Sequence, residues 1–141
     1  MKILLIYPNN TGYSRVPIGL ALINTCLLKA GHDVEVYDTT FYNIFKQMDD
    51  DIREKLFQVK KSDLKSFVTY EQKSINMITK ELNDLVAEYK PGLIGFTTNE
   101  ELLEFAFHLA QSVKKASDCP VVFGGIAVTM SPIDIISKPY I

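Results

Sequence analysis

The residues best suited to holding a ligand follow three short apolar segments of the chain. They combine amides, hydroxyls, glycines, one aromatic ring and one isoleucine, and none is a strong acid or base. Such a set can grip a polar ligand through backbone and amide groups, but it is poorly suited to acid–base catalysis. These candidate binding residues are Tyr7, Asn9, Asn10, Thr11, Thr97, Thr98, Asn99, Gly124, Gly125, Ile126 and Thr129.

Several familiar sites are absent from the sequence. It has neither GxGxxG nor GxxxxGK[ST], which argues against a dinucleotide fold and a P-loop. A receiver domain needs carboxylates where Tyr7 and Thr98 stand. No Ser or Cys has a plausible histidine partner, because His32 falls in a helix-to-strand turn and His108 in the middle of a predicted helix. We therefore expect no catalytic residue and no protein metal ligand.

Cys26 and Cys119 are the only cysteines, and they are far apart in the chain. Two isolated thiols cannot build a disulfide framework, a zinc site or an iron–sulfur site. We expect both to be small buried side chains.

Apolar patterning predicts the elements that position the candidate residues. Continuous apolar runs are typical of strands buried on both faces of a parallel sheet, whereas alternation indicates a strand near an edge. The predicted strands are 2–7, 33–38 (the alternating one), 93–97 and 120–123. The predicted helices are 17–30 (apolar on nearly every side and so largely buried), 41–56, 75–89, 98–115 (opened by a Thr98-x-x-Glu101 capping box) and 131–138.

This order of elements predicts an α/β protein with a doubly wound parallel sheet. A flavodoxin-like strand order of 2-1-3-4, with a fifth strand missing, suits 141 residues. We expect one domain over 1–141, with a variable helical insertion at about 43–70. Because ligands bind outside the carboxyl ends of parallel strands, the candidate residues should meet at one edge.

The amino-acid composition limits the kinds of partner that the protein is expected to bind. Lysine and arginine total 15 against 17 acidic residues, so the net charge is −2, which offers no electrostatic footprint for nucleic acid or an anionic membrane. The longest apolar runs are too short to cross a bilayer, and the first residues run straight into a strand without a secretory signal. The cytoplasm is the expected location.

The chain resembles a known family over most of its length. The matching strings are KILLIYPN from Lys2, PxGLAL from Pro17, KAGHDVEVYD from Lys29, KPGLIGFT from Lys90 and VVFGGIAVT from Val121. In this order they are similar to the N-terminal cobalamin-binding domain of B12-dependent radical SAM enzymes. The charged stretch from about Asn43 to Tyr70 lies outside the resemblance.

The resemblance implies a flavodoxin-like domain with the corrin across the carboxyl edge of the sheet. Asn9, Asn10 and Thr11 would then lie under the corrin, Thr97–Asn99 would form a polar loop, and Gly124-Gly125 would let the nucleotide tail pass. The Asp-x-His-x-x-Gly loop that ligates cobalt in better-known cobalamin domains is missing, so we expect no protein histidine on cobalt. A [4Fe-4S] cluster and S-adenosylmethionine would belong to a C-terminal radical SAM domain in cis, because CxxxCxxC is absent here.

Two alternatives remain open: a flavodoxin-like domain for FMN or another nucleotide, and an interaction module without a ligand. A typical family member has a fifth strand directly after Pro139–Ile141, so the sequence is expected to be a piece of a longer protein. The apolar strand 121–123 would then be a free edge, through which we expect self-association. Gly125→Val is expected to remove ligand binding and spare the fold.

Overall fold

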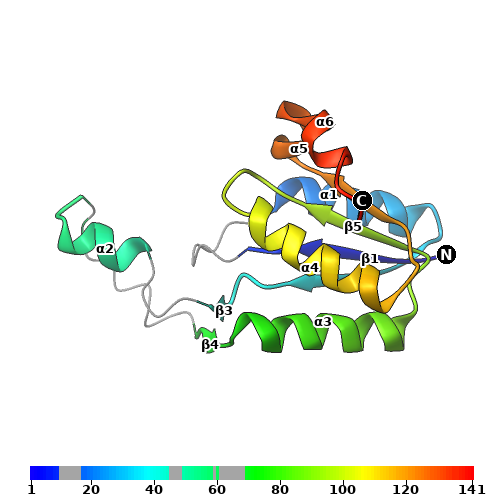
Figure 1. Ribbon diagram of the computed structural model, residues 1–141, viewed down its shortest axis with the longest axis horizontal. Coiled ribbons are helices and arrows are strands. Elements are labelled where there is room, and N and C mark those ends of the chain that lie inside the picture. The colour runs from blue at the N-terminus through cyan, green and yellow to red at the C-terminus, as the bar shows by residue number, and fades with distance from the viewer. Residues whose placement is uncertain (10–16, 45–48, 59, 61–68) are drawn as a thin grey trace.

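Four parallel strands form the main sheet of the computed structural model, which describes residues 1–9, 17–44, 49–58, 60 and 69–141. The strands are β1 (Lys2–Tyr7), β2 (Asp33–Asp38), β5 (Leu93–Thr97) and β6 (Val121–Gly124), in the order β2-β1-β5-β6 (Figure 1). This is the predicted order 2-1-3-4, and the α/β, flavodoxin-like fold class is confirmed.

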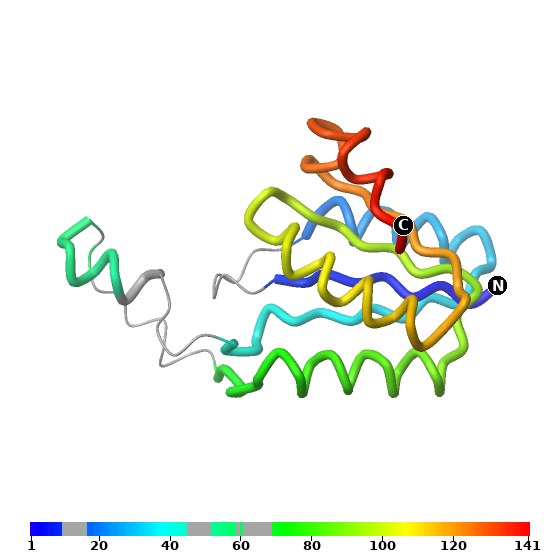
Figure 2. Tube along the Cα trace, in the orientation of Figure 1, coloured from blue at the N-terminus to red at the C-terminus, as the bar shows by residue number. Residues whose placement is uncertain are grey.

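Helices cover the two faces of the sheet unequally. Among the described residues, one face carries α3 (Ile75–Tyr89) and α4 (Leu103–Ala116), and the other carries α1 (Ile18–Lys29) (Figure 2). Two short helices, α5 (Ile126–Met130) and α6 (Pro132–Ile136), follow β6, and α5 was not predicted.

Alternate residues of the central strands fill two separate cores, as the pleat requires. On the α3–α4 side the large side chains that are fully buried are Leu4, Ile6, Ile78, Leu82, Ile94, Leu109 and Val113. On the α1 side the core is smaller and contains Ile3, Leu5, Tyr7, Leu20 and Leu102.

The prediction that the first helix is largely buried is wrong for the described residues. In α1 only Leu20 is buried, while large apolar side chains such as Ile18 and Leu22 are more than 60% exposed. Cys26 is exposed as well, against prediction, whereas Cys119 is buried. The reason is geometric: α1 packs on β1 and β2, and nothing described lies on its outer sides.

The predicted helix over 41–56 is also wrong in its first part. Tyr42–Asn43 form a short strand, β3, that pairs in parallel with β4 (Glu71–Gln72), and the helix α2 spans only Asp49–Lys55. The Glu71 N–H donates to the Phe41 carbonyl at 2.9 Å. Pairing with a segment almost thirty residues away overrides the local helical spacing.

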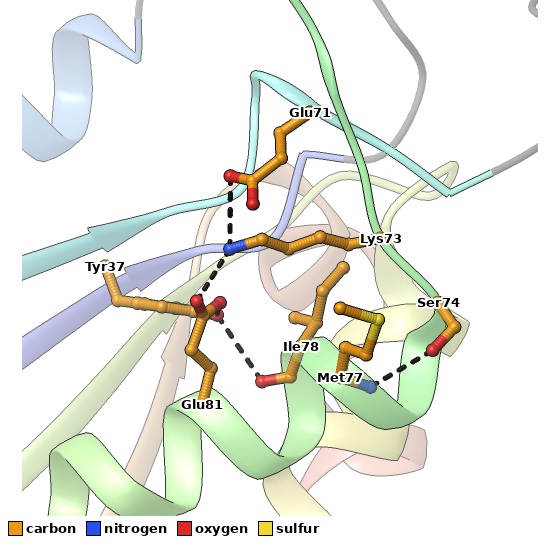
Figure 3. A network of polar contacts seen from close by, with 7 residues as sticks. All are labelled: Tyr37, Glu71, Lys73, Ser74, Met77, Ile78 and Glu81. Carbon is orange, nitrogen blue, oxygen red and sulfur yellow. Dashed lines mark hydrogen bonds and ion pairs between the residues drawn. The ribbon is translucent and has the colours of Figure 1, made fainter.

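A buried cation joins this small sheet to the main body (Figure 3). The Lys73 ammonium lies 2.6 Å from Glu81 Oε1 of α3 and 3.3 Å from Glu71 Oε2 of β4. It also lies 3.9 Å from the centre of the Tyr42 ring. The Tyr37 hydroxyl of β2 donates to Glu81 Oε2 at 3.2 Å, so one network connects four elements.

The network changes the proton affinities of two of its members. Burial, and then the Glu81 carboxylate, raises the pKa of Tyr37 far above its ordinary value of 10.0. Desolvation lowers the pKa of Lys73, but its hydrogen bonds to Glu81 and Tyr42 outweigh this effect, and the net pKa is raised. Both groups therefore hold their protons more tightly in the folded protein than in the unfolded chain.

We expect the free energy of unfolding to fall as the pH rises above about 10. The unfolded chain then releases the Tyr37 proton and the folded protein does not, which costs about 1.4 kcal/mol per pH unit. At pH 7 the Tyr37→Phe variant should lose about 1 kcal/mol, the worth of one hydrogen bond. Urea unfolding between pH 7 and 11 should show that this deficit shrinks as the pH rises. A constant deficit would contradict the assignment.

Candidate functional site

Two loops meet at the carboxyl edge of the sheet. The Thr98 N–H, just after β5, donates to the Gly124 carbonyl of β6 at 2.9 Å. Because β5 also pairs with β1, the end of β1 at Tyr7 lies beside the same edge. The structure thus brings together the residues 97–99 and 124–126, as the parallel topology predicted.

A pocket of about 370 Å³ opens between the loop after β5 and helix α5. One wall is polar, and the other is apolar because α5 contributes aliphatic and thioether side chains. The lining residues are Asn99, Glu100, Glu101, Ile126, Ala127 and Met130. Only Asn99 and Ile126 were predicted as site residues. The two glutamates look like helix-capping acids in the sequence, and Met130 lies in a helix that was not predicted.

The predicted capping box does not form. Thr98 is buried and bonds to β6, so its side chain does not cap α4. Instead, Asn99 Oδ1 accepts a hydrogen bond from the Leu102 N–H at 3.0 Å, and α4 begins at Leu103. The amide oxygen of Asn99 is thereby committed to the backbone.

The other predicted site residues differ in their accessibility. Tyr7 is buried in the core on the α1 side, and Asn9 is only 1% exposed. Asn9 Nδ2 donates to Thr40 Oγ1 at 3.2 Å, while Thr39 Oγ1 donates to the Asn9 carbonyl at 2.9 Å. Asn9 thus joins the loops that follow β1 and β2. Asn10 and Thr11 lie outside the described residues.

Helix α5 presents two more of the predicted positions. Ile126 is exposed at its first turn and lines the pocket. The Thr129 hydroxyl is exposed too, but it donates to the Gly125 carbonyl at 3.2 Å. Ile126 can therefore touch a ligand in the pocket, while Thr129 supports the turn from which α5 starts.

The two adjacent glycines have different roles. Gly125 has φ +101°, and a Cβ there would overlap the Thr98 carbonyl oxygen. A Cβ on Gly124 would meet only the Phe96 carbonyl oxygen, at an ordinary 3.9 Å. The expectation that Gly125→Val would spare the fold is therefore wrong. The fold itself requires glycine at 125, and Gly124 is the position with open space.

Both histidines of the chain lie away from the carboxyl edge. His32 precedes β2, at the opposite edge, with its Nδ1 3.3 Å from the amino terminus. His108 Nε2 lies 3.3 Å from Thr79 Oγ1, between α4 and α3. Within the described ranges, no group of three or more His, Cys, Asp or Glu side chains is arranged to hold a metal ion.

The Cys119 thiol is not poised for chemistry either. It is buried and donates to the Pro91 carbonyl at 3.1 Å. Burial raises its pKa, and nearby Lys114 offsets this only in part, so the reactive thiolate is disfavoured.

Comparison with solved structures identifies proteins of similar fold. The chain is similar to TsrM, a radical S-adenosylmethionine methyltransferase from Kitasatospora setae, in a structure with cobalamin and a [4Fe-4S] cluster bound. The TM-score is 0.63 at 22% identity, over 96% of this chain and 20% of that one. A second TsrM structure, with tryptophan substrate and the S-adenosylmethionine analogue aza-SAM, gives 0.62 at 22% identity over 93% and 20%.

The chain therefore spans about a fifth of the length of these TsrM chains. No family model and no curated protein sequence matches it. No helix among the described residues is long and apolar enough to cross a membrane.

The contrast between the two glycines can be tested with single alanines. Gly125→Ala should lower the free energy of unfolding by about 2–4 kcal/mol, because it combines backbone strain with overlap on Thr98. Gly124→Ala should change it by less than about 0.5 kcal/mol. Urea denaturation of both variants measures the difference. Equal losses would mean that the two positions are equivalent turn residues.

Proposed function

We propose that this chain is the cobalamin-binding domain of a B12-dependent radical SAM enzyme. The observation that carries the proposal is the site at the carboxyl edge, on a fold shared with a structure solved with cobalamin bound. Three of the five matching sequence strings, those from Lys2, Lys90 and Val121, end in the loops at this edge and support the same assignment.

The pocket residues suit a large ligand with an apolar body and an amide-bearing rim. Ile126 and Met130 offer apolar contact, and Gly124 leaves room for a ligand to approach the backbone. The carboxylates of Glu100 and Glu101 can accept hydrogen bonds from the amide groups around a corrin. The same carboxylates would repel a phosphate group, and both FMN and the nucleotide tail of cobalamin carry one, so these two residues do not discriminate between the cofactors.

The residues of this chain would bind and orient the cofactor, and the reaction itself would be performed elsewhere. Cobalamin in such enzymes supplies a cobalt centre that carries a methyl group or supports a cyclisation. A [4Fe-4S] cluster and S-adenosylmethionine would belong to a radical SAM domain of the same polypeptide. We also propose that the protein is located in the cytoplasm.

Cobalamin binding is tested directly with hydroxocobalamin. The purified protein should retain it through desalting and show its visible spectrum, and FMN should not be retained. Gly124→Val should weaken cobalamin binding at least about tenfold, because the added side chain fills space beside the backbone.

The matched control for this experiment is Gly92→Val. Gly92 lies before β5 at the opposite edge, where a Cβ meets only ordinary contacts at 3.7 Å or more. This variant should bind like the wild type. Retention of FMN without cobalamin would refute the proposal, and retention of neither would favour the interaction module.

The cobalt should carry no histidine from residues 1–141, because His32 and His108 are both away from the carboxyl edge. The EPR spectrum of the cobalt(II) complex should therefore be the same in the wild type and in a His32→Ala/His108→Ala double variant. Nitrogen superhyperfine splitting that disappears in the double variant would show that a histidine ligates the metal.

A further inference from the structure

A second pocket, of about 240 Å³, lies between helix α4 and the segment that follows α6. Four of its lining residues stand at positions i, i+3, i+4 and i+7 of α4, so they share one side of that helix, and two come from the later segment. The lining residues are Glu104, Phe107, His108, Gln111, Lys138 and Tyr140. None of them lines the pocket at the carboxyl edge, so the two pockets are separate.

Aromatic contacts hold the later segment against α4 (Figure 1). The Tyr140 ring lies edge-on to the Phe107 ring, with the two ring centres 5.9 Å apart. The Lys138 ammonium lies 5.3 Å from the centre of the same Phe107 ring. Phe107 is itself buried in a small core with Ile135 of α6. The pocket therefore has a packed base, to which two segments distant in the sequence contribute.

The pocket contains one cation and one anion that do not pair with each other. Within the described part of the chain, neither the Glu104 carboxylate nor the Lys138 ammonium forms a salt bridge. Glu104 is exposed and Lys138 is half-buried, so both charged groups can be reached from the solvent. Two opposite charges in one small pocket are therefore available to a ligand.

The hydrogen bonds around His108 determine which of its ring nitrogens carries the proton. Thr79 Oγ1 donates its single proton to the Ile75 carbonyl at 2.8 Å. It can therefore only accept at its 3.3 Å contact with His108 Nε2. The neutral imidazole consequently has its proton on Nε2, and its Nδ1 is left as a hydrogen-bond acceptor.

The Tyr140 hydroxyl is a hydrogen-bond donor in the same pocket. Burial, and then the Glu104 carboxylate, raises the pKa of Tyr140, so the phenol keeps its proton. The pocket thus offers donors at Lys138 and Tyr140 and acceptors at Glu104 and His108, while the amide of Gln111 can serve as either. This set complements a ligand that has both a negative and a positive group.

We propose that this pocket binds a small α-amino acid in its zwitterionic form. The ligand carboxylate pairs with Lys138 and accepts from Tyr140, and the ligand ammonium pairs with Glu104. A neutral ligand would leave both protein charges without a partner, and a simple anion or cation would leave one. The volume is below the roughly 300–1,000 Å³ of pockets for drug-sized ligands, so the side chain of the amino acid is short. The inference does not depend on whether the carboxyl edge binds cobalamin.

The test compares L-serine with two analogues of similar size, by ligand-observed NMR titration of the purified full-length protein. Glycerate has a hydroxyl in place of the ammonium, and serinol has a hydroxymethyl group in place of the carboxylate. L-Serine should bind with a Kd of about 1 mM or tighter, and each analogue at least about tenfold more weakly. The absence of L-serine binding at about 10 mM overturns the proposal, and so does equal binding of the three compounds.

A pair of variants assigns the binding to this pocket. Lys138→Gln should weaken the binding of L-serine at least about tenfold and leave serinol unaffected, because serinol has no carboxylate. Glu104→Gln should weaken L-serine similarly and leave glycerate unaffected, because glycerate has no ammonium. An amino-acid site elsewhere in the protein would not produce this reciprocal pattern. Variants that bind L-serine like the wild type would therefore overturn the assignment.

The matched control is Lys115→Gln. Lys115 is exposed in the last turn of the same helix and does not line the pocket. This variant should bind all three compounds like the wild type, and weakening equal to that of Lys138→Gln would overturn the proposal. Thermal melting checks that each variant folds, and the comparison of the three compounds on the wild type stands even if one variant does not.

Discussion

The close contact between the Gly125 backbone and the Thr98 carbonyl determines the shape of the carboxyl edge. It holds the loop after β5 against the start of α5, and the Thr98–Gly124 hydrogen bond adds to it. Two residues that line the pocket directly follow this contact in the sequence: Asn99 follows Thr98, and Ile126 follows Gly125. The walls of the pocket are therefore set by a main-chain contact that exists without any ligand. Such preorganisation would spare any ligand bound at this edge the cost of ordering two loops.

The sheet and its order were predictable because the parallel strands are buried on both faces. The unbroken apolar runs of β1 and β5 are stable only at the centre of a sheet that is covered on both faces. The alternation in β2 indicated an edge strand, as the strand order confirms. Helix α3 was predictable for a related reason. Its apolar stripe has a regular period, Ser74 caps its first turn, and Lys90 ends it just before Pro91. In both cases the local pattern and the tertiary environment agree.

The predictions from the sequence are wrong where long-range contacts outweigh the local sequence pattern. Thr98 fits a capping box by spacing, but its backbone is already bonded to β6, and Asn99 bonds the turn at Leu102 that precedes α4. Asn9 has an amide that could bind a ligand, but its side chain is buried and donates a hydrogen bond to Thr40. The prediction that α1 is buried followed its apolar composition, but among the described residues α1 packs only on β1 and β2. Neither a hydrogen-bond partner nor a neighbouring helix can be read from residue spacing alone.

The small parallel pairing of β3 with β4 has a consequence for how this domain can diversify. Tyr42 pairs with Glu71, and Lys73 connects this pairing to α3 through Glu81. The two ends of the long segment between β3 and β4 therefore lie side by side. The entropy of closing a loop grows only with the logarithm of its length, and a doubling adds about 0.6 kcal/mol. Residues can therefore be inserted into or deleted from the segment between β3 and β4 with little effect on the stability of the sheet. Helix α2, which belongs to this segment, lies on the side of the carboxyl edge in Figure 1, so such changes would alter the surroundings of that edge while leaving the scaffold unchanged.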